Sequence, residues 1–258
     1  MANLVGALLR SVLTDEQIVQ FGWRVAFLTG ILIAPVAVLL HAYGEESSVI
    51  DVDLNDQDRG RATGAVEHSN STISTSSQQS RPLSEALQRE NWLALLSTFL
   101  TPMLAGAGYY VTFVWMAIYM KTLIDPPVAG AFWVNLLATI CGYGFPSITA
   151  GMLSDRYGRN KVMTVGAVSV GIVAPFMIWI ISWGVTWKAF LAQWTIGVLL
   201  SIFTGPMWAW LPEKYNPKVR LTSAALGYNL GMCISAGFSP AVATALVHGY
   251  GPLAPAIL

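Results

Sequence analysis

Six long apolar stretches constrain this chain more than any other feature of its sequence. A helix of about 20 mostly apolar residues crosses the hydrocarbon core of a bilayer, and each stretch reaches that length. Lipid offers no water to the backbone, so a spanning segment must satisfy its own hydrogen bonds as a helix. The sequence therefore predicts an all-α membrane protein with about six transmembrane helices. The stretches cover residues 24–43, 92–119, 130–153, 162–183, 187–211 and 222–247.

Charged residues are scarce and unevenly placed. They make up 11% of the chain, against about 25% in a typical soluble domain. Nine of the fourteen acidic residues lie between Glu45 and Glu90, and only Asp125, Asp155 and Glu213 follow. So few charges cannot build a water-facing surface, which makes the lipid bilayer the expected surroundings. The net charge is zero, so a nucleic-acid partner is not expected.

The apolar and polar stretches divide the chain into four parts. Residues 1–21 are interpreted as the tail of a preceding helix with its loop, and residues 22–44 as one transmembrane helix. Residues 45–90 are polar and contain no Phe, Trp or Tyr, so they are predicted to be a disordered cytoplasmic linker. Residues 91–258 hold the other five predicted spans.

Basic residues gather in two of the short loops and predict the orientation. The opposite loops contain only Lys121 and Lys188. Loops rich in Lys and Arg usually stay in the cytoplasm, and two spans separate each of these loops from the next and from the long linker. We expect both loops and the linker to be cytoplasmic in a multi-pass protein of the plasma membrane. The six loop residues are Arg156, Arg159, Lys161, Lys214, Lys218 and Arg220.

The loop after the third predicted span reads GMLSDRYGRNK, from Gly151 to Lys161. Glycine permits close helix contact at the start and a tight turn later in the loop, and an aspartate can accept hydrogen bonds near a helix end. The loop resembles the signature loop of the major facilitator superfamily, G-x-x-x-D-R-x-G-R. An ordinary basic membrane loop is the alternative. The matching residues are Gly151, Asp155, Arg156, Gly158 and Arg159.

Three further segments resemble the metabolite–proton symporter branch of that superfamily, which includes proline/betaine transporters. The triplet Gly22-Trp23-Arg24 is similar to the start of its sixth helix. The segments GPMWAWLPE at 205–213, Val-Arg at 219–220 and GYNLG at 227–231 are similar to its tenth and eleventh helices. The resemblance implies a partial major facilitator fold that covers about helices six to eleven.

The resemblance also implies a function for the full-length protein. It would carry a small organic solute of the proline, betaine or small carboxylate type, by alternating access and with proton symport. Such transporters have two six-helix halves with the substrate between them. We expect this chain to be a fragment with half a site, whose partners are lipid, solute and proton, with the missing half or another copy as a further candidate. The alternative is a truncated, non-transporting fragment or a regulator.

In this family the signature loop faces an acidic residue that follows the tenth helix. Glu213 resembles that acid. The resemblance therefore implies a charge network that stabilises one conformational state. Its members would be Asp155, Arg156, Arg159, Glu213 and Arg220.

Polar and aromatic side chains fall at helical spacing within the spans and are candidates for the substrate pathway. Amides are costly in hydrocarbon, so they should face protein or a watery cavity. Aromatic rings beside amides would suit a small zwitterion or cation. The alternative is that these residues only join helices. The candidates are Tyr109, Thr112, Asn135, Gln193, Thr204, Trp208 and Asn229.

Other classes of function find no support in the sequence. The spans contain no paired acids, His cluster or Ser/His pair, so neither an enzyme nor a metal or cofactor site is expected. No acidic or basic residue lies near the middle of a span, so a proton-coupling acid is expected elsewhere in the transporter. Gly227 and Gly231 have the G-x-x-x-G spacing of closely packed helices. Cys141 and Cys233 are expected to be buried free thiols.

Overall fold

The computed structural model describes residues 2–28, 35, 38, 92–215 and 219–257. Of these described residues, 9–28, 35 and 38 belong to one compact unit, and 2–8 together with 92–215 and 219–257 belong to another. The N-terminal residues form the helices α1 (Ala2–Val12), α2 (Asp15–Gln17), η1 (Ile18–Gly22) and α3 (Trp23–Leu28). Most of the first predicted span and the whole 45–90 linker lie outside the described residues.

Five helical stretches of the described part are long and apolar enough to cross a membrane. They confirm the second to sixth predicted spans, with ends that differ by several residues. No strand occurs in the described ranges, and the all-α fold class is confirmed. The stretches are Trp92–Leu123, Ala131–Tyr157, Arg159–Ile181, Thr186–Glu213 and Arg220–Tyr250.

The first two of the five described spans are interrupted by π-helical segments, in which the hydrogen-bond register lengthens by one residue. The first span consists of α7 (Trp92–Tyr109), η4 (Tyr110–Trp115), α8 (Met116–Ile118) and η5 (Tyr119–Leu123). The second consists of α9 (Ala131–Ala138), η6 (Thr139–Gly144) and α10 (Phe145–Tyr157). Segments of this kind free backbone carbonyls for other donors and often occur at functional positions.

The remaining three of the five described spans are more regular. The third is the single helix α11 (Arg159–Ile181). The fourth divides into α12 (Thr186–Thr204) and α13 (Met207–Glu213) beside Pro206, which lacks the N–H that a continuous helix needs. The fifth is α14 (Arg220–Tyr250), followed by the short 3-10 helix η7 (Ala254–Ile257).

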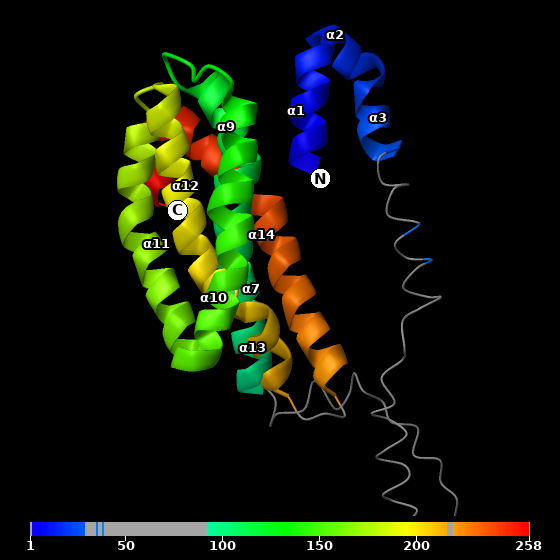
Figure 1. Cartoon of the computed structure of the whole chain (residues 1–258), viewed down its shortest axis with the longest axis vertical. Coiled ribbons are helices and arrows are strands. Elements are labelled where there is room, and N and C mark those ends of the chain that lie inside the picture. Colours follow the sequence, from blue (N-terminus) through cyan, green and yellow to red (C-terminus); the bar gives the residue numbers. More distant parts are fainter. Residues whose placement is uncertain (1, 29–34, 36–37, 39–91, 216–218, 258) are drawn as a thin grey trace, which may run out of the picture. The chain divides into compact units, whose positions relative to one another are not determined.

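The five spans pack side by side in one bundle, in which α14 lies along α7 and α11 lies along α12 (Figure 1). Glycines allow the closest approaches. A Cβ added at Gly227 would lie 2.5 Å from Thr98 Oγ1, and one at Gly231 would lie 3.0 Å from the backbone nitrogen of Met103. Both contacts join α14 to α7, so the predicted G-x-x-x-G packing is confirmed within this chain.

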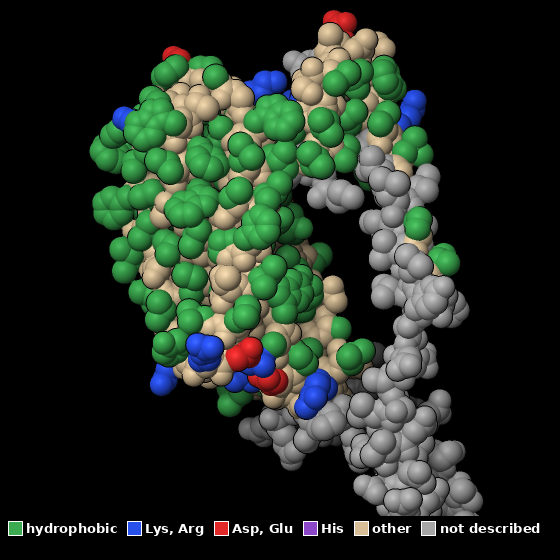
Figure 2. Space-filling view, viewed as in Figure 1, with side chains coloured by type: hydrophobic (Ala, Val, Ile, Leu, Met, Phe, Trp, Pro, Cys, Tyr) green, Lys and Arg blue, Asp and Glu red, His purple; other side chains and the backbone are tan. Residues whose placement is uncertain are grey.

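Hydrophobic side chains cover most of the visible face of this bundle, and Lys, Arg, Asp and Glu gather at its ends (Figure 2). This distribution suits a bilayer, with an apolar belt between two polar surfaces. Cys141 and Cys233 are free, but both are exposed on the helix surface, so the expectation that they are buried was wrong. A small apolar residue such as Cys is compatible with lipid, and an apolar run therefore cannot distinguish a lipid-facing position from a buried one.

Candidate functional site

The loop that carries the signature motif is a single-residue turn. Gly158 ends α10 and begins α11, with a φ of 91° that favours glycine. The chain therefore turns sharply there and brings the last turn of α10 against the first turn of α11. Gly151 behaves differently from expectation, because a Cβ added there would meet no described atom within 4 Å. The close helix contact expected at Gly151 is not made by the described part of the chain.

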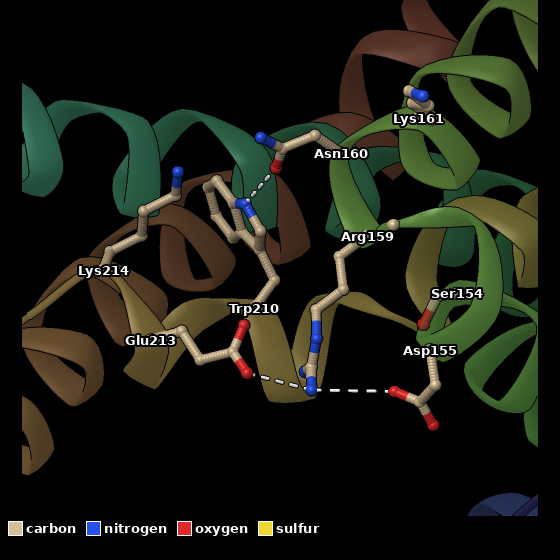
Figure 3. Close-up of a pocket in the computed structure, with 9 residues that line it drawn as sticks. Ser154, Asp155, Arg159, Asn160, Lys161, Trp210, Glu213 and Lys214 are labelled. Atoms are coloured by element: carbon tan, nitrogen blue, oxygen red, sulfur yellow. Dashed lines mark hydrogen bonds and ion pairs between the residues drawn. The ribbon is translucent and has the colours of Figure 1, made fainter.

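Arg159 lies between two carboxylates at this end of the bundle (Figure 3). Its Nη2 is 2.9 Å from Oε1 of Glu213 on α13 and 3.7 Å from Oδ1 of Asp155 on α10. The Arg159 side chain is 25% exposed, whereas those of Glu213 and Asp155 are 53% and 67% exposed. We call these three residues the Arg159 bridge. It connects α10, α11 and α13 through partly hydrated charges.

A neutral hydrogen bond lies beside the bridge. The Trp210 Nε1–H donates to Asn160 Oδ1 at 2.7 Å (Figure 3). Trp210 and Glu213 are one helical turn apart on α13, so two consecutive residues of α11 contact two residues of α13. Sequence reasoning did not identify Asn160 or Trp210. The sequence offered one signal for Trp210, namely a tryptophan three positions before Glu213, the acid that the family resemblance implies.

A cavity of about 600 Å³ opens around these contacts. Both Lys161 and Lys214 line it, and the Lys214 Nζ lies 4.8 Å from the centre of the Trp210 ring. The cavity therefore combines the Arg159 bridge with further cationic side chains. The lining residues are Ser154, Asp155, Gly158, Arg159, Asn160, Lys161, Trp210, Glu213 and Lys214.

Two of the five residues expected in the charge network are not joined to it by ion pairs among the described residues. Arg156 has no ion pair to Asp155 or Glu213 within 4 Å. Arg220 lies with its Nε 3.5 Å from the backbone carbonyl of Tyr215. That tyrosine shares a 2.6 Å hydrogen bond with the Thr98 hydroxyl. Burial raises the pKa of Tyr215, and the opposing effect of this hydrogen bond is smaller. Tyr215 therefore stays neutral and joins the end of the segment after α13 to α7.

Four of the seven substrate-pathway candidates are buried, and three of them, Thr112, Asn135 and Gln193, form one hydrogen-bonded group between helices. Gln193 Nε2 donates to the Thr112 carbonyl at 2.7 Å and lies 2.6 Å from Asn135 Oδ1, while Asn135 Nδ2 donates to the Phe113 carbonyl at 2.9 Å. The two accepting carbonyls belong to the π-helical segment η4. Asn135 and Gln193 are 3% and 0% exposed, so the amides join α9, α12 and η4 rather than line an open surface.

Three of the other four candidates, Tyr109, Thr204 and Trp208, contact aromatic rings. Tyr109 packs against Tyr143 with their ring centroids 5.2 Å apart, and the Thr204 hydroxyl is 3.1 Å from that of Tyr143. Trp208 is 57% exposed and packs against Tyr228 at 5.2 Å. Asn229 is exposed, and its Nδ2 donates to the Ala225 carbonyl of its own helix.

Comparison with known proteins agrees with this architecture. Residues 1–240 match the family model of the Major Facilitator Superfamily. The inner membrane metabolite transport protein YhjE of Escherichia coli K12 is 27% identical over 97% of this chain and 53% of its own length. The proline/betaine transporter of Salmonella typhimurium LT2 is 22% identical over 95% of this chain and 46% of its own length.

A third relative, the citrate-proton symporter of Klebsiella pneumoniae, is 24% identical over 97% of this chain and 52% of its own length. The chain thus spans about half the length of the curated relatives that it matches. No solved structure gives a significant match. Because the family model matches most of the chain and the five apolar spans agree with it, the protein is a multi-pass membrane protein that belongs to the major facilitator superfamily.

Proposed function

We propose that this chain forms one portion of a carrier that moves a small organic solute across a membrane by alternating access. Alternating access requires helices that separate and re-associate at each end of the bundle. The observation that carries the proposal is the Arg159 bridge, because it holds the α10–α11 turn against the end of α13. Opening that end would pull Arg159 away from Glu213.

The strength of the Arg159 bridge suits a reversible contact. An ion pair between partly exposed side chains contributes about 0–1 kcal/mol, because water screens it. Two conformations of a carrier differ by only a few kcal/mol, so a contact of this size changes their populations without locking either one. The neutral bond between Trp210 and Asn160 would open in the same movement, because it joins the same two helices.

We propose a solute of the proline, betaine or small carboxylate type and symport with protons. The printed names of the relatives, a proline/betaine transporter and a citrate-proton symporter, support this range. The middles of the five described spans contain no Asp, Glu, Lys or Arg. The group that carries the proton is therefore proposed to lie outside these spans, in helices contributed by the rest of the transporter or by another copy.

The proposed orientation places the Arg159 bridge and the 45–90 linker in the cytoplasm. Its support is the excess of Lys and Arg in the α10–α11 turn and after α13, compared with the opposite loops. The bridge would then control access to the cytoplasmic side.

Transport in proteoliposomes tests the proposal. The protein is reconstituted both as the 258-residue chain and in an assembly that contains both halves of the fold. Labelled proline, glycine betaine and citrate are offered under an inward proton gradient. We expect saturable uptake of one of them, sensitive to an uncoupler, by the assembly that contains both halves of the fold, and none by the 258-residue chain alone. Absence of uptake of all three solutes by every assembly would contradict the proposed function.

A further inference from the structure

Four tyrosines from three spans gather at membrane depth. Tyr109 contacts Tyr110 and Tyr143, with ring centroids 5.8 Å and 5.2 Å apart. Tyr228 is included because it packs on the same buried hydrophobic cluster as Tyr109 and Tyr143. We call these four residues the tyrosine quartet. Its members come from α7, η4, η6 and α14, and all four are partly exposed.

The packing beneath the tyrosine quartet fixes its position. Phe113 is fully buried and contacts Tyr109 and Tyr143, with centroid distances of 5.4 Å to both. Tyr109, Tyr143 and Tyr228 also pack on the same buried hydrophobic cluster. The rings are therefore held against a rigid apolar base, and their outer parts remain accessible. Trp208 extends this aromatic surface, since it packs on Tyr228 and is itself 57% exposed.

The described helices that carry this surface hold no formal charge at this depth. Residues 93–120, 131–154, 189–212 and 221–247, which include every member, contain no Asp, Glu, Lys or Arg. A ligand carboxylate therefore finds no cationic partner on these described helices at this depth. A cation finds no carboxylate there, but it finds the electron-rich faces of several rings, which attract a cation within about 6 Å of the ring centre.

We propose that the tyrosine quartet and Trp208 bind the quaternary ammonium group of a small zwitterion of the glycine betaine type. A quaternary ammonium has no N–H to donate, so it requires no acceptor and is well matched to ring faces. Tyrosine hydroxyls are neutral donors for the carboxylate of the same ligand. A citrate-like ligand with three carboxylates would lack cationic partners on this surface. The inference rests on the proposed function, within which it selects one class of solute.

Binding to the unmodified 258-residue chain in lipid nanodiscs tests the inference. The probe is labelled glycine betaine, and the competitors are tetramethylammonium and 3,3-dimethylbutanoate. The second competitor has the shape of glycine betaine but carries a neutral carbon in place of the ammonium nitrogen. We expect tetramethylammonium to displace the probe and 3,3-dimethylbutanoate to compete at least about tenfold more weakly, because the cation–π contribution is lost. Equal competition by the neutral analogue, or no binding of the probe, would overturn the inference.

Substitutions locate the site. Tyr143→Leu and Trp208→Leu should each weaken glycine betaine binding by roughly threefold to thirtyfold, whereas Tyr143→Phe and Trp208→Phe should retain most of it because they keep the ring. Trp179→Leu is the matched control, since Trp179 is an exposed aromatic residue in a ring pair, on a helix that contributes no member of the site. Unchanged binding by both leucine variants, or an equal loss in the control, would overturn the inference.

The uptake assay separates this inference from the proposed function. Uptake of citrate or proline by a chain that does not bind glycine betaine would leave the carrier function standing and overturn the proposed site. Binding of glycine betaine with the expected competition, but without uptake of any solute by any assembly, would support the site and contradict the carrier function.

Discussion

The contact between α14 and α7 gives a prediction whose magnitude follows from the structure. A Cβ added at Gly227 would lie 2.5 Å from Thr98 Oγ1 and 3.0 Å from the Thr98 carbonyl carbon and oxygen, whereas ordinary contacts lie at 3.4–4 Å. The Thr98 backbone belongs to α7 and cannot move alone. Gly227→Ala should therefore force α14 and α7 apart by roughly 0.5–1 Å, a gap that removes a quarter to a half of the contact energy of the affected atoms.

We expect this clash to cost about 1–3 kcal/mol, the range for overpacking a tight interface. Replacing a helical glycine by alanine also favours the helix by about 1 kcal/mol, which partly offsets the clash. Gly237→Ala provides the control on the same helix, because a Cβ added at Gly237 would meet nothing within 4 Å. The two variants share the gain in helix propensity, so the difference between them isolates the clash.

Unfolding in detergent micelles, followed by far-UV circular dichroism during a denaturant titration, measures both variants. Gly227→Ala should be less stable than Gly237→Ala by about 1–3 kcal/mol. Equal stability of the two variants would show that α14 and α7 do not approach closely at Gly227.

Three further predictions concern the buried amides, the neutral hydrogen bond and the orientation. Gln193→Leu should lower the free energy of unfolding by about 1–3 kcal/mol in the same denaturant titration, because two buried acceptors lose their donor. Asn229→Leu, at an exposed amide, should change it by less than about 0.5 kcal/mol. Asn160→Ala and Trp210→Phe should show a coupling energy of about 0.5–1.5 kcal/mol in a double-mutant cycle, and simple additivity would contradict the hydrogen bond. A cysteine at Tyr157, in a chain without its native cysteines, should react with an impermeant maleimide only after the cells are permeabilised, and labelling of intact cells would reverse the proposed orientation.

The sequence predicted the second to sixth spans because about 20 apolar residues suffice to cross a bilayer, whatever the tertiary contacts are. It could not predict the π-helical segments. The residues of η4, YVTFVW, contain no glycine or proline that would mark an irregular helix. Their register depends on partners distant in sequence, since the freed carbonyls of Thr112 and Phe113 accept hydrogen bonds from Gln193 and Asn135.

The same register shift separates two of the substrate-pathway candidates, Tyr109 and Thr112. A uniform helical period places Tyr109 and Thr112 on one face of their span. In the structure Tyr109 joins the aromatic surface with Tyr143, whereas Thr112 is 5% exposed and lies beside Gln193. Polar spacing alone cannot tell an amide that joins helices from one that faces a cavity, because both environments satisfy its hydrogen bonds.

The signature loop illustrates a different limit. The family resemblance implied that Arg159 and Glu213 meet, and they lie 2.9 Å apart, although the role of that contact stays a proposal. It could not show that Arg156 and Arg220 make no ion pair with these two residues, because the direction of a long side chain depends on how its helix packs. The motif also carried no sign of the bond between Asn160 and Trp210.

A double-mutant cycle on transport tests the central claim most directly, namely that this chain is part of a carrier whose Arg159 bridge opens and closes during turnover. Arg159→Gln, Glu213→Gln and the double variant are reconstituted in the assembly that contains both halves of the fold, and initial uptake rates are compared at equal protein density. Each single variant should lower uptake, and the double variant should be no slower than the slower single one, because both remove the same contact. Uptake unchanged in both single variants, or independent losses that multiply in the double variant, would contradict the account.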